Sequence, residues 1–309
     1  MNFQPFTQKI LFGHNLIFDN LIELYNNNKL PNKILLSGEK GIGKSTLAYH
    51  LINFILSSDE DYSYDKKNYE INTENKSFKL LMNKSNPNFY LIDVNEDRKN
   101  IDINQIRELI LNLNKSSFNL KPRFVLIDNI ELLNTNSVNA LLKILEEPND
   151  NINFILINNN KKILPTLKSR CLNFKVFLTK EESVEISNRI INKNINDLLN
   201  HELMNHYITP GQLLKILEFS DEYEINLKNI NLKEFLLILI KDRIYKKEKS
   251  INNIIFSFIE LYFRNNISVN NNNLIELYRY FLTKINNTKI YNLDEETLFI
   301  EFEDKVLNG

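Results

Sequence analysis

A glycine-rich segment of eight residues constrains this 309-residue chain more than any other feature. Its sequence is Gly38-Glu39-Lys40-Gly41-Ile42-Gly43-Lys44-Ser45, and it holds three of the six glycines in the chain. An apolar run at residues 34–36 precedes it, and apolar residues at helical spacing follow it from 47 to 55. This is the G-x-x-x-x-G-K-[ST] pattern in the strand, loop and helix context that it requires. The alternative, a glycine-rich turn followed by an accidental Lys-Ser, is disfavoured in a chain so poor in glycine.

Such a loop predicts a binding site for a nucleoside triphosphate. Its glycines let successive backbone N–H groups point into one concavity, and the following helix N-terminus adds a partial positive charge. Lys44 is expected to reach the β- and γ-phosphates, and the Ser45 hydroxyl is expected to complete a Mg²⁺ shell. The predicted contacts to ATP or ADP from this segment are Gly38, Glu39, Lys40, Gly41, Ile42, Gly43, Lys44, Ser45 and Thr46.

Composition excludes several classes of protein. A net charge of −1 and a pI of about 6.5 provide no basic field for tight, autonomous DNA binding. The single cysteine, Cys171, excludes an internal disulfide and a cysteine-rich zinc module. The longest apolar run, at residues 235–240, is too short to cross a bilayer, and the N-terminus lacks a signal-peptide pattern. We therefore expect a cytoplasmic protein with no membrane partner.

The first part of the chain alternates between strand and helix signals, which predicts a mostly parallel sheet flanked by helices. A helix is expected at residues 103–113 and another from about residue 136. A polar stretch at residues 57–77 has no clear periodicity and is expected to be a surface insertion or a flexible loop. The expected strands are residues 34–36, 89–92, 124–127, 154–157 and 172–177.

The strand signal fades after residue 178. Thr179 and Glu182 have the spacing of a capping box, which predicts the start of a run of helices. Pro210 and Gly211 interrupt this run, and further helices are expected from about residue 227. The sequence thus predicts an α/β P-loop domain at 1–178, a small helical lid at 179–222 and an all-α domain at 223–309.

Asp128 ends one of the predicted strands at a plausible distance after the P-loop. A carboxylate there can hold Mg²⁺ through water, so Ser45 and Asp128 are the predicted metal contacts. The alternative is an aspartate that caps a turn. The next residue is Asn129, whose amide cannot act as a general base, so hydrolysis should be weak even where binding survives. Glu131 lies nearby, but the local backbone would have to bend to use it.

Two further motifs carry a resemblance to a known family. Residues 139–148 read N-A-L-L-K-I-L-E-E-P, and residues 164–171 read L-P-T-L-K-S-R-C. Both resemble signatures of the bacterial DNA polymerase III clamp-loader ATPases, which are AAA+ proteins. The resemblance covers roughly residues 10–215. Asp128 stands at the position of the family's Walker B aspartate. Within the family the chain looks most like the delta-prime branch, because the gamma/tau branch keeps a glutamate after this aspartate and an arginine in the lid.

The resemblance implies a subunit of a five-membered ring that opens the sliding clamp and places it on primed DNA during replication. The implied partners are gamma/tau and delta subunits, with clamp and DNA bound through the complex in a nucleoid-associated replisome. Arg170 matches the family's arginine finger, which acts in trans on the γ-phosphate held by a neighbour. Residues 223–309 correspond to the collar that joins the ring. If the resemblance is set aside, the alternative for Arg170 is an ordinary ion pair at the surface. The alternative for residues 223–309 is a self-contained helical bundle with no partner.

The chain departs from the family pattern at three places. Asn158 or Asn159 stands at the polar sensor position after the 154–157 strand, and Asn158 is the predicted nucleotide contact. Gly211 stands where active relatives carry an arginine, and the cysteines of the zinc module are absent. We therefore expect ATP binding with little or no hydrolysis, no zinc, and a part in the polymerase III holoenzyme other than polymerisation.

Two rival functions remain open. A gamma/tau-type clamp-loader ATPase would hydrolyse ATP on its own, which Asn129 and Gly211 disfavour. A P-loop kinase acting on a small substrate would need a substrate pocket and a lid arginine, and the sequence identifies neither.

Overall fold

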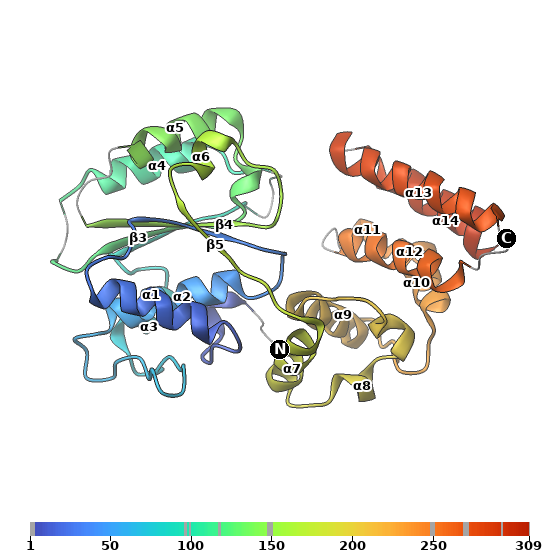
Figure 1. The fold of residues 1–309 in the computed structure, drawn as a ribbon, viewed down its shortest axis with the longest axis horizontal. Helices are drawn as coiled ribbons and strands as arrows, with labels where there is room; N and C mark the ends of the chain where they lie inside the picture. Colours follow the sequence, from blue (N-terminus) through green and yellow to red (C-terminus); the bar gives the residue numbers. More distant parts are fainter. Residues whose placement is uncertain are drawn as a thin grey trace. The chain divides into compact units, whose positions relative to one another are not determined.

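The computed structural model describes residues 4–95, 98, 100–116, 119–146, 151–247, 251–267, 272–291 and 293–308. The chain forms two compact units, each described separately below (Figure 1). The first contains the residues up to 186 and the short segment 209–211, and the second contains residues 187–208 and 212–309. The predicted division into three domains, with boundaries after residues 178 and 222, stays a prediction.

The first unit is built on a five-stranded sheet in which neighbouring strands are parallel. The strands are β1 (Lys33–Ser37), β2 (Phe89–Ile92), β3 (Arg123–Ile127), β4 (Ile152–Asn158) and β5 (Leu172–Lys175). Their order is β2-β3-β4-β1-β5, so the carboxyl ends of the interior strands β1, β3 and β4 meet at one edge. Ligands of open parallel sheets bind at this edge.

Helices cover both faces of this sheet (Figure 1). On one face lie α1 (Asn15–Asn26), α2 (Lys44–Leu56) and α3 (Lys76–Met82). On the other lie α4 (Ile103–Leu113), α5 (Thr135–Glu146) and α6 (Pro165–Lys168). Because both faces are covered, the interior strands are apolar nearly throughout, as buried parallel strands require.

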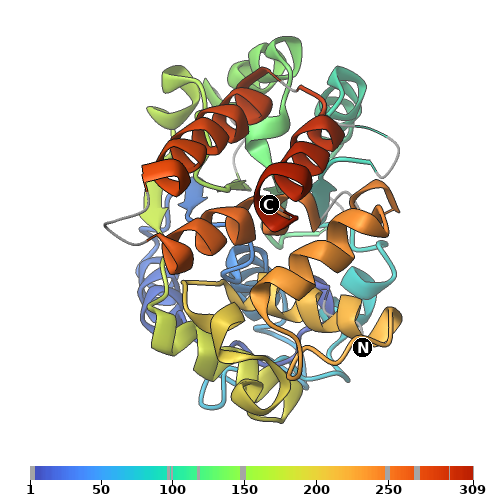
Figure 2. The same ribbon diagram turned by 90° about the vertical axis from the view of Figure 1, so that its right-hand side faces the viewer.

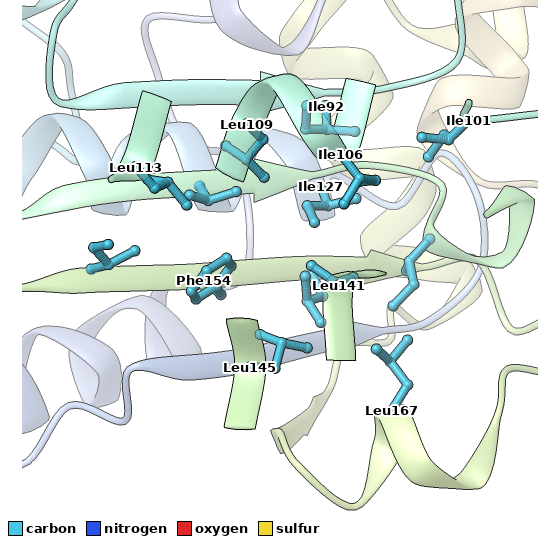
Figure 3. Packing of buried hydrophobic residues seen from close by; sticks show 14 of the residues in the cluster. Ile92, Ile101, Ile106, Leu109, Leu113, Ile127, Leu141, Leu145, Phe154 and Leu167 are labelled. Atoms are coloured by element: carbon cyan, nitrogen blue, oxygen red, sulfur yellow. The ribbon is translucent and has the colours of Figure 1, made fainter. Parts of the chain in front are cut away.

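The core between α4, α5 and the sheet is made of aliphatic and aromatic side chains (Figure 3). Ile106 of α4 and Leu141 of α5 are fully buried, and they belong to one cluster with Phe154 from the sheet. Burying one such side chain stabilises a fold by ~1.5–3 kcal/mol. This layer packs α4 and α5 against one face of the sheet (Figure 3).

The segment at residues 57–77 corrects one prediction. We expected a surface insertion or a flexible loop, but this segment packs on α1 and α2. Tyr64 is buried, and its ring lies 5.3 Å from that of Phe18 and 5.9 Å from that of Phe54. Ile71 is also buried. Because these side chains are irregularly spaced and each fills a separate gap, the segment has no periodicity that the sequence could reveal.

The second unit is helical (Figure 2). Two helices, α7 (Lys180–Ile191) and α9 (Pro210–Glu222), run across the division between the units. Among the described residues, the other α-helices of this unit are α8 (Ile195–Leu198), α10 (Leu232–Lys241), α11 (Ile244–Lys247), α12 (Asn252–Asn266), α13 (Asn272–Tyr291) and α14 (Glu295–Phe302). Aromatic rings fill its core, among them Phe235, Phe258, Phe263, Phe281, Phe299 and Phe302. Within the described ranges, no helix has the length and apolar character to span a bilayer.

The predicted architecture is confirmed: a parallel α/β sheet with a P-loop after β1, followed by helices. Strand β2 has the predicted bounds, and β5 ends two residues before the predicted strand does. The capping box before α7 is present, since the Glu182 N–H donates to Thr179 Oγ1 at 3.2 Å and the Thr179 N–H donates to the Glu182 carboxylate at 2.7 Å. Residues 147–150, which follow α5, lie outside the described residues.

Candidate nucleotide site

The P-loop joins β1 to α2 at the carboxyl edge of the sheet, and its glycines are required by geometry. A side chain at Gly38 would place its Cβ 2.2 Å from the carbonyl oxygen of Val176. Gly41 and Gly43 have φ angles of 89° and 92°, in the left-handed region that glycine adopts without strain. The predicted loop and the helix after it are therefore formed in full.

Lys44 closes this loop from the inside. Its ammonium group donates to the carbonyl oxygens of Gly38 at 2.9 Å and Glu39 at 2.5 Å. The side chain is 3% exposed, and burial lowers the pKa of Lys44 to about 8. The positive charge thus lies at the centre of the loop, where a polyphosphate would be held.

The structure brings together the two predicted metal contacts. The Ser45 hydroxyl, in the first turn of α2, donates to the Asp128 carboxylate at 2.5 Å. Burial raises the pKa of Asp128, because a charged carboxyl loses hydration there. Oxygen donors of these types are what Mg²⁺ prefers, so the pair fits the ion that accompanies a nucleotide. Thr46 follows in the same turn and is half-buried.

The residue after Asp128 is held by its neighbours at the sheet edge. Asn129 has a φ of 53°, and its side-chain amide donates to the Asp93 carboxylate at 2.7 Å. Its carbonyl oxygen accepts from the Asn159 amide at 2.9 Å. The same Asn159 amide donates to the Glu131 carboxylate at 3.0 Å. Both ends of the Asn129 side chain are therefore occupied by protein groups.

Asn158, the predicted sensor residue, contacts the P-loop through its backbone. Its carbonyl oxygen accepts from the Gly38 N–H at 3.2 Å. Its side chain turns instead to Lys161, accepting from that backbone N–H at 3.2 Å and donating to that carbonyl at 3.0 Å. Contact between the Asn158 side chain and a nucleotide stays a prediction.

Arg170 lies outside this site, at the turn between α6 and β5. Its guanidinium pairs with the Glu146 carboxylate and donates to the Thr166 carbonyl at 2.8 Å. The side chain is 30% exposed. Arg170, the predicted arginine finger, thus has its contacts apart from the P-loop of its own chain. Its pairing with Glu146 was not predicted from the sequence.

Sequence reasoning also missed the residues that support the P-loop from outside. His14 and Thr209 each contact a carbonyl oxygen of the loop, and so does the backbone of Gly211. The only available signals were the Gly13-His14 pair and the Pro210-Gly211 pair, which mark turns but do not reveal their contacts.

These features define a P-loop protein with an α/β fold, whose loop has the geometry that would suit a nucleotide. Comparison with known proteins then identifies the family. The sequence model described as "DNA polymerase III, delta subunit" matches residues 13–179, just over half of the chain. The chain belongs to this family.

Curated relatives carry the names of DNA polymerase III subunits. A DNA polymerase III subunit delta' from Buchnera aphidicola (subsp. Schizaphis graminum) is 26% identical over 283 residues, which cover 87% of this chain and 83% of that protein. A subunit gamma/tau from Mycoplasma genitalium is 29% identical over 219 residues, 71% of this chain and 34% of that protein. A gamma subunit-related crystal structure from Thermotoga maritima shares 18% identity, with a TM-score of 0.49, and covers 91% of this chain and 96% of that one. The chain spans between a third and a half of the length of several curated relatives, with values of 34%, 48% and 48%.

Proposed function

We propose that this chain is a delta-prime-type subunit of the DNA polymerase III clamp loader. It would help to load the sliding clamp onto primed DNA, in a ring with gamma/tau and delta subunits. The choice of branch rests on Asn129 and Gly211, because a delta' relative and a gamma relative both match over most of their own length. Clamp and DNA would be bound through the whole complex, which suits a chain with a net charge of −1.

The P-loop would hold ATP or ADP with Mg²⁺. The backbone N–H groups of residues 38–46 would surround the phosphates, Lys44 would neutralise part of their charge, and Ser45 with Asp128 would hold the metal. The bound Mg²⁺ would supply charge neutralisation for the phosphate groups. The contact between Ser45 and Asp128 at 2.5 Å supports this assignment, because both oxygens already face one point.

The observation that carries the proposal is the state of Asn129. Asn129 follows Asp128, at the position where active ATPases of the family carry a glutamate. Its side chain is held between Asp93 and Asn159. An amide has no basic lone pair to accept a proton from an attacking water. The site therefore combines a complete phosphate loop with no base at this position, which favours binding over turnover.

Arg170 would then act on a neighbouring subunit. A planar guanidinium that stays protonated suits the charge that develops on a phosphoryl group. To reach a neighbour it must leave Glu146, and an exposed pair of this kind is worth only ~0–1 kcal/mol. The pair therefore presents a small obstacle to the proposed role.

Reconstitution with gamma/tau and delta subunits tests this function. Arg170→Ala and Arg170→Lys complexes are compared with wild type and with Arg107→Ala, which removes an exposed arginine of α4. Both Arg170 variants should assemble normally but lose DNA- and clamp-stimulated ATP hydrolysis at the adjoining site, where such fingers are worth roughly 10³–10⁵-fold. The loss for the whole complex should be smaller, because other sites still turn over. Unchanged clamp loading by both variants would show that Arg170 is only a surface charge.

One observation favours a gamma/tau-type ATPase as the second candidate. The Glu131 carboxylate is held at the sheet edge by the Asn159 backbone and side chain, at 3.2 Å and 3.0 Å, and it interacts electrostatically with Lys44. A carboxylate there could order water in place of the missing glutamate. A turnover assay on the isolated chain decides between the two: rapid hydrolysis that Glu131→Gln abolishes would establish the ATPase.

A further inference from the structure

Three successive carbonyl oxygens of the P-loop accept hydrogen bonds from groups outside the loop. The donors come from the segment before α1 and from the start of α9, which is distant in sequence but part of the same compact unit. The contacts are Thr209 Oγ1 to the Lys40 carbonyl at 2.9 Å, the Gly211 N–H to the Gly41 carbonyl at 2.8 Å and His14 Nε2 to the Ile42 carbonyl at 2.6 Å. We call His14, Thr209 and Gly211 the outer brace.

We propose that the outer brace positions the phosphate cradle, an inference that rests on the proposed nucleotide site. The N–H and C=O groups of a peptide unit point in opposite directions, so carbonyls held from outside leave the loop N–H groups facing the concavity. Lys44 holds the two preceding carbonyls from within. Every carbonyl from 38 to 42 is therefore paired, and the loop keeps one conformation without a ligand.

Gly211 contributes to the brace because it lacks a side chain. A Cβ at this position would lie 2.7 Å from Gly41 Cα and 3.0 Å from the Gly41 carbonyl oxygen. Both neighbours are backbone atoms, so neither can swing aside. Gly211 therefore has a role of its own, beyond the absence of the lid arginine. Its backbone holds the P-loop, and a side chain at this position would push the loop away.

Thr209 contributes through a fully buried hydroxyl. Valine has nearly the same shape but cannot donate, so Thr209→Val would leave the Lys40 carbonyl without this partner. Serine keeps the hydroxyl. These two substitutions separate the hydrogen bond from the packing at one position, and Thr283→Val provides a matched control on α13, where that hydroxyl donates to the Arg279 carbonyl at an exposed site.

Binding of a fluorescent ADP analogue with Mg²⁺ is measured on the full chain. Thr209→Val should bind about fivefold more weakly, the effect of one net hydrogen bond. Thr209→Ser and Thr283→Val should bind as wild type does. Hydrogen exchange of residues 38–46 without nucleotide should be faster in Thr209→Val alone, which reports on the brace independently of ligand binding.

Gly211→Ala and Gly211→Arg provide the sharper test. Both should bind ADP more than about tenfold more weakly, and Gly211→Arg should gain no hydrolysis. Tight binding or new turnover by Gly211→Arg would overturn the inference, as would equal loop exchange in wild type and Thr209→Val. If wild type binds no ADP while Thr209→Val still speeds loop exchange, the brace stands and the proposed nucleotide site fails. Should the Gly211 variants not fold, the Thr209 pair decides.

Discussion

His50 lies in α2 with a fully buried ring, and we expect acid to destabilise the P-loop unit through it. Its Nε2–H donates to the Gln8 carbonyl at 3.1 Å, and its Nδ1 accepts from the Tyr64 hydroxyl at 2.8 Å. This tautomer is assigned because a carbonyl oxygen can only accept. Burial lowers the pKa of His50 from 6.5 to about 4, so the folded protein keeps the ring neutral.

The size of the effect follows from this shift. Between the two pKa values the unfolded chain binds a proton that the folded chain excludes, so stability falls as the pH falls through this window. A difference of one pH unit between the two pKa values corresponds to ~1.4 kcal/mol. The whole difference therefore lowers the free energy of unfolding by an amount of the order of 3 kcal/mol. The loss is absent above pH 6.5, the value for the unfolded chain, and complete near pH 4.

The test compares wild type with His50→Gln and with His201→Gln, which changes an exposed histidine. Urea unfolding followed by circular dichroism gives the free energy of unfolding at neutral pH and at pH 5. Wild type and His201→Gln should lose about 2 kcal/mol more than His50→Gln over this range. An equal loss in all three proteins would refute the reasoning, and so would an NMR titration that places the pKa of His50 near 6.5.

Three further predictions concern the metal, the nucleotide and the core. Elemental analysis of the purified protein should find no stoichiometric zinc, because one cysteine and four histidines offer no cysteine-rich ligand set, and one zinc per chain would contradict this. Lys44→Ala should abolish binding of ATP and ADP, measured by calorimetry, while the circular dichroism spectrum stays native; retained binding would remove Lys44 from the site. Leu141→Ala should lower the free energy of unfolding by about 2–5 kcal/mol through a cavity in the core, whereas Leu111→Ala, at a side chain 67% exposed, should change it by less than about 0.5 kcal/mol. Similar losses in both leucine variants would contradict the packing in Figure 3.

Local patterns predicted the elements that carry the site. The apolar run at 124–127 and the residue after it predicted that Asp128 stands at the end of β3, because a buried strand and its boundary are both visible in a few consecutive letters. The P-loop was predictable for the same reason, since its glycines serve conformations set within the loop itself.

Contacts between distant segments were not predictable. Thr209 lies 169 residues from Lys40, and no local rule connects a buried hydroxyl to one carbonyl of the P-loop. The orientation of the Asn158 side chain depends on the backbone of Lys161, so the sequence could indicate the position but not the contact. Tyr64 fills a gap between helices whose shape exists only after they pack.

Strand β5 links the two chemically distinctive parts of this chain. Arg170 precedes its first residue by two positions, and Val176, just after its last, has its carbonyl oxygen against Gly38. From Leu172 to Val176 an extended chain spans about 13 Å, and pairing with β1 prevents it from stretching or folding back. The separation between the arginine and the chain's own phosphate loop is thus set by the length of one strand. A single-residue deletion in β5 would reposition the arginine and disturb the loop at once, so the two parts cannot be adjusted independently.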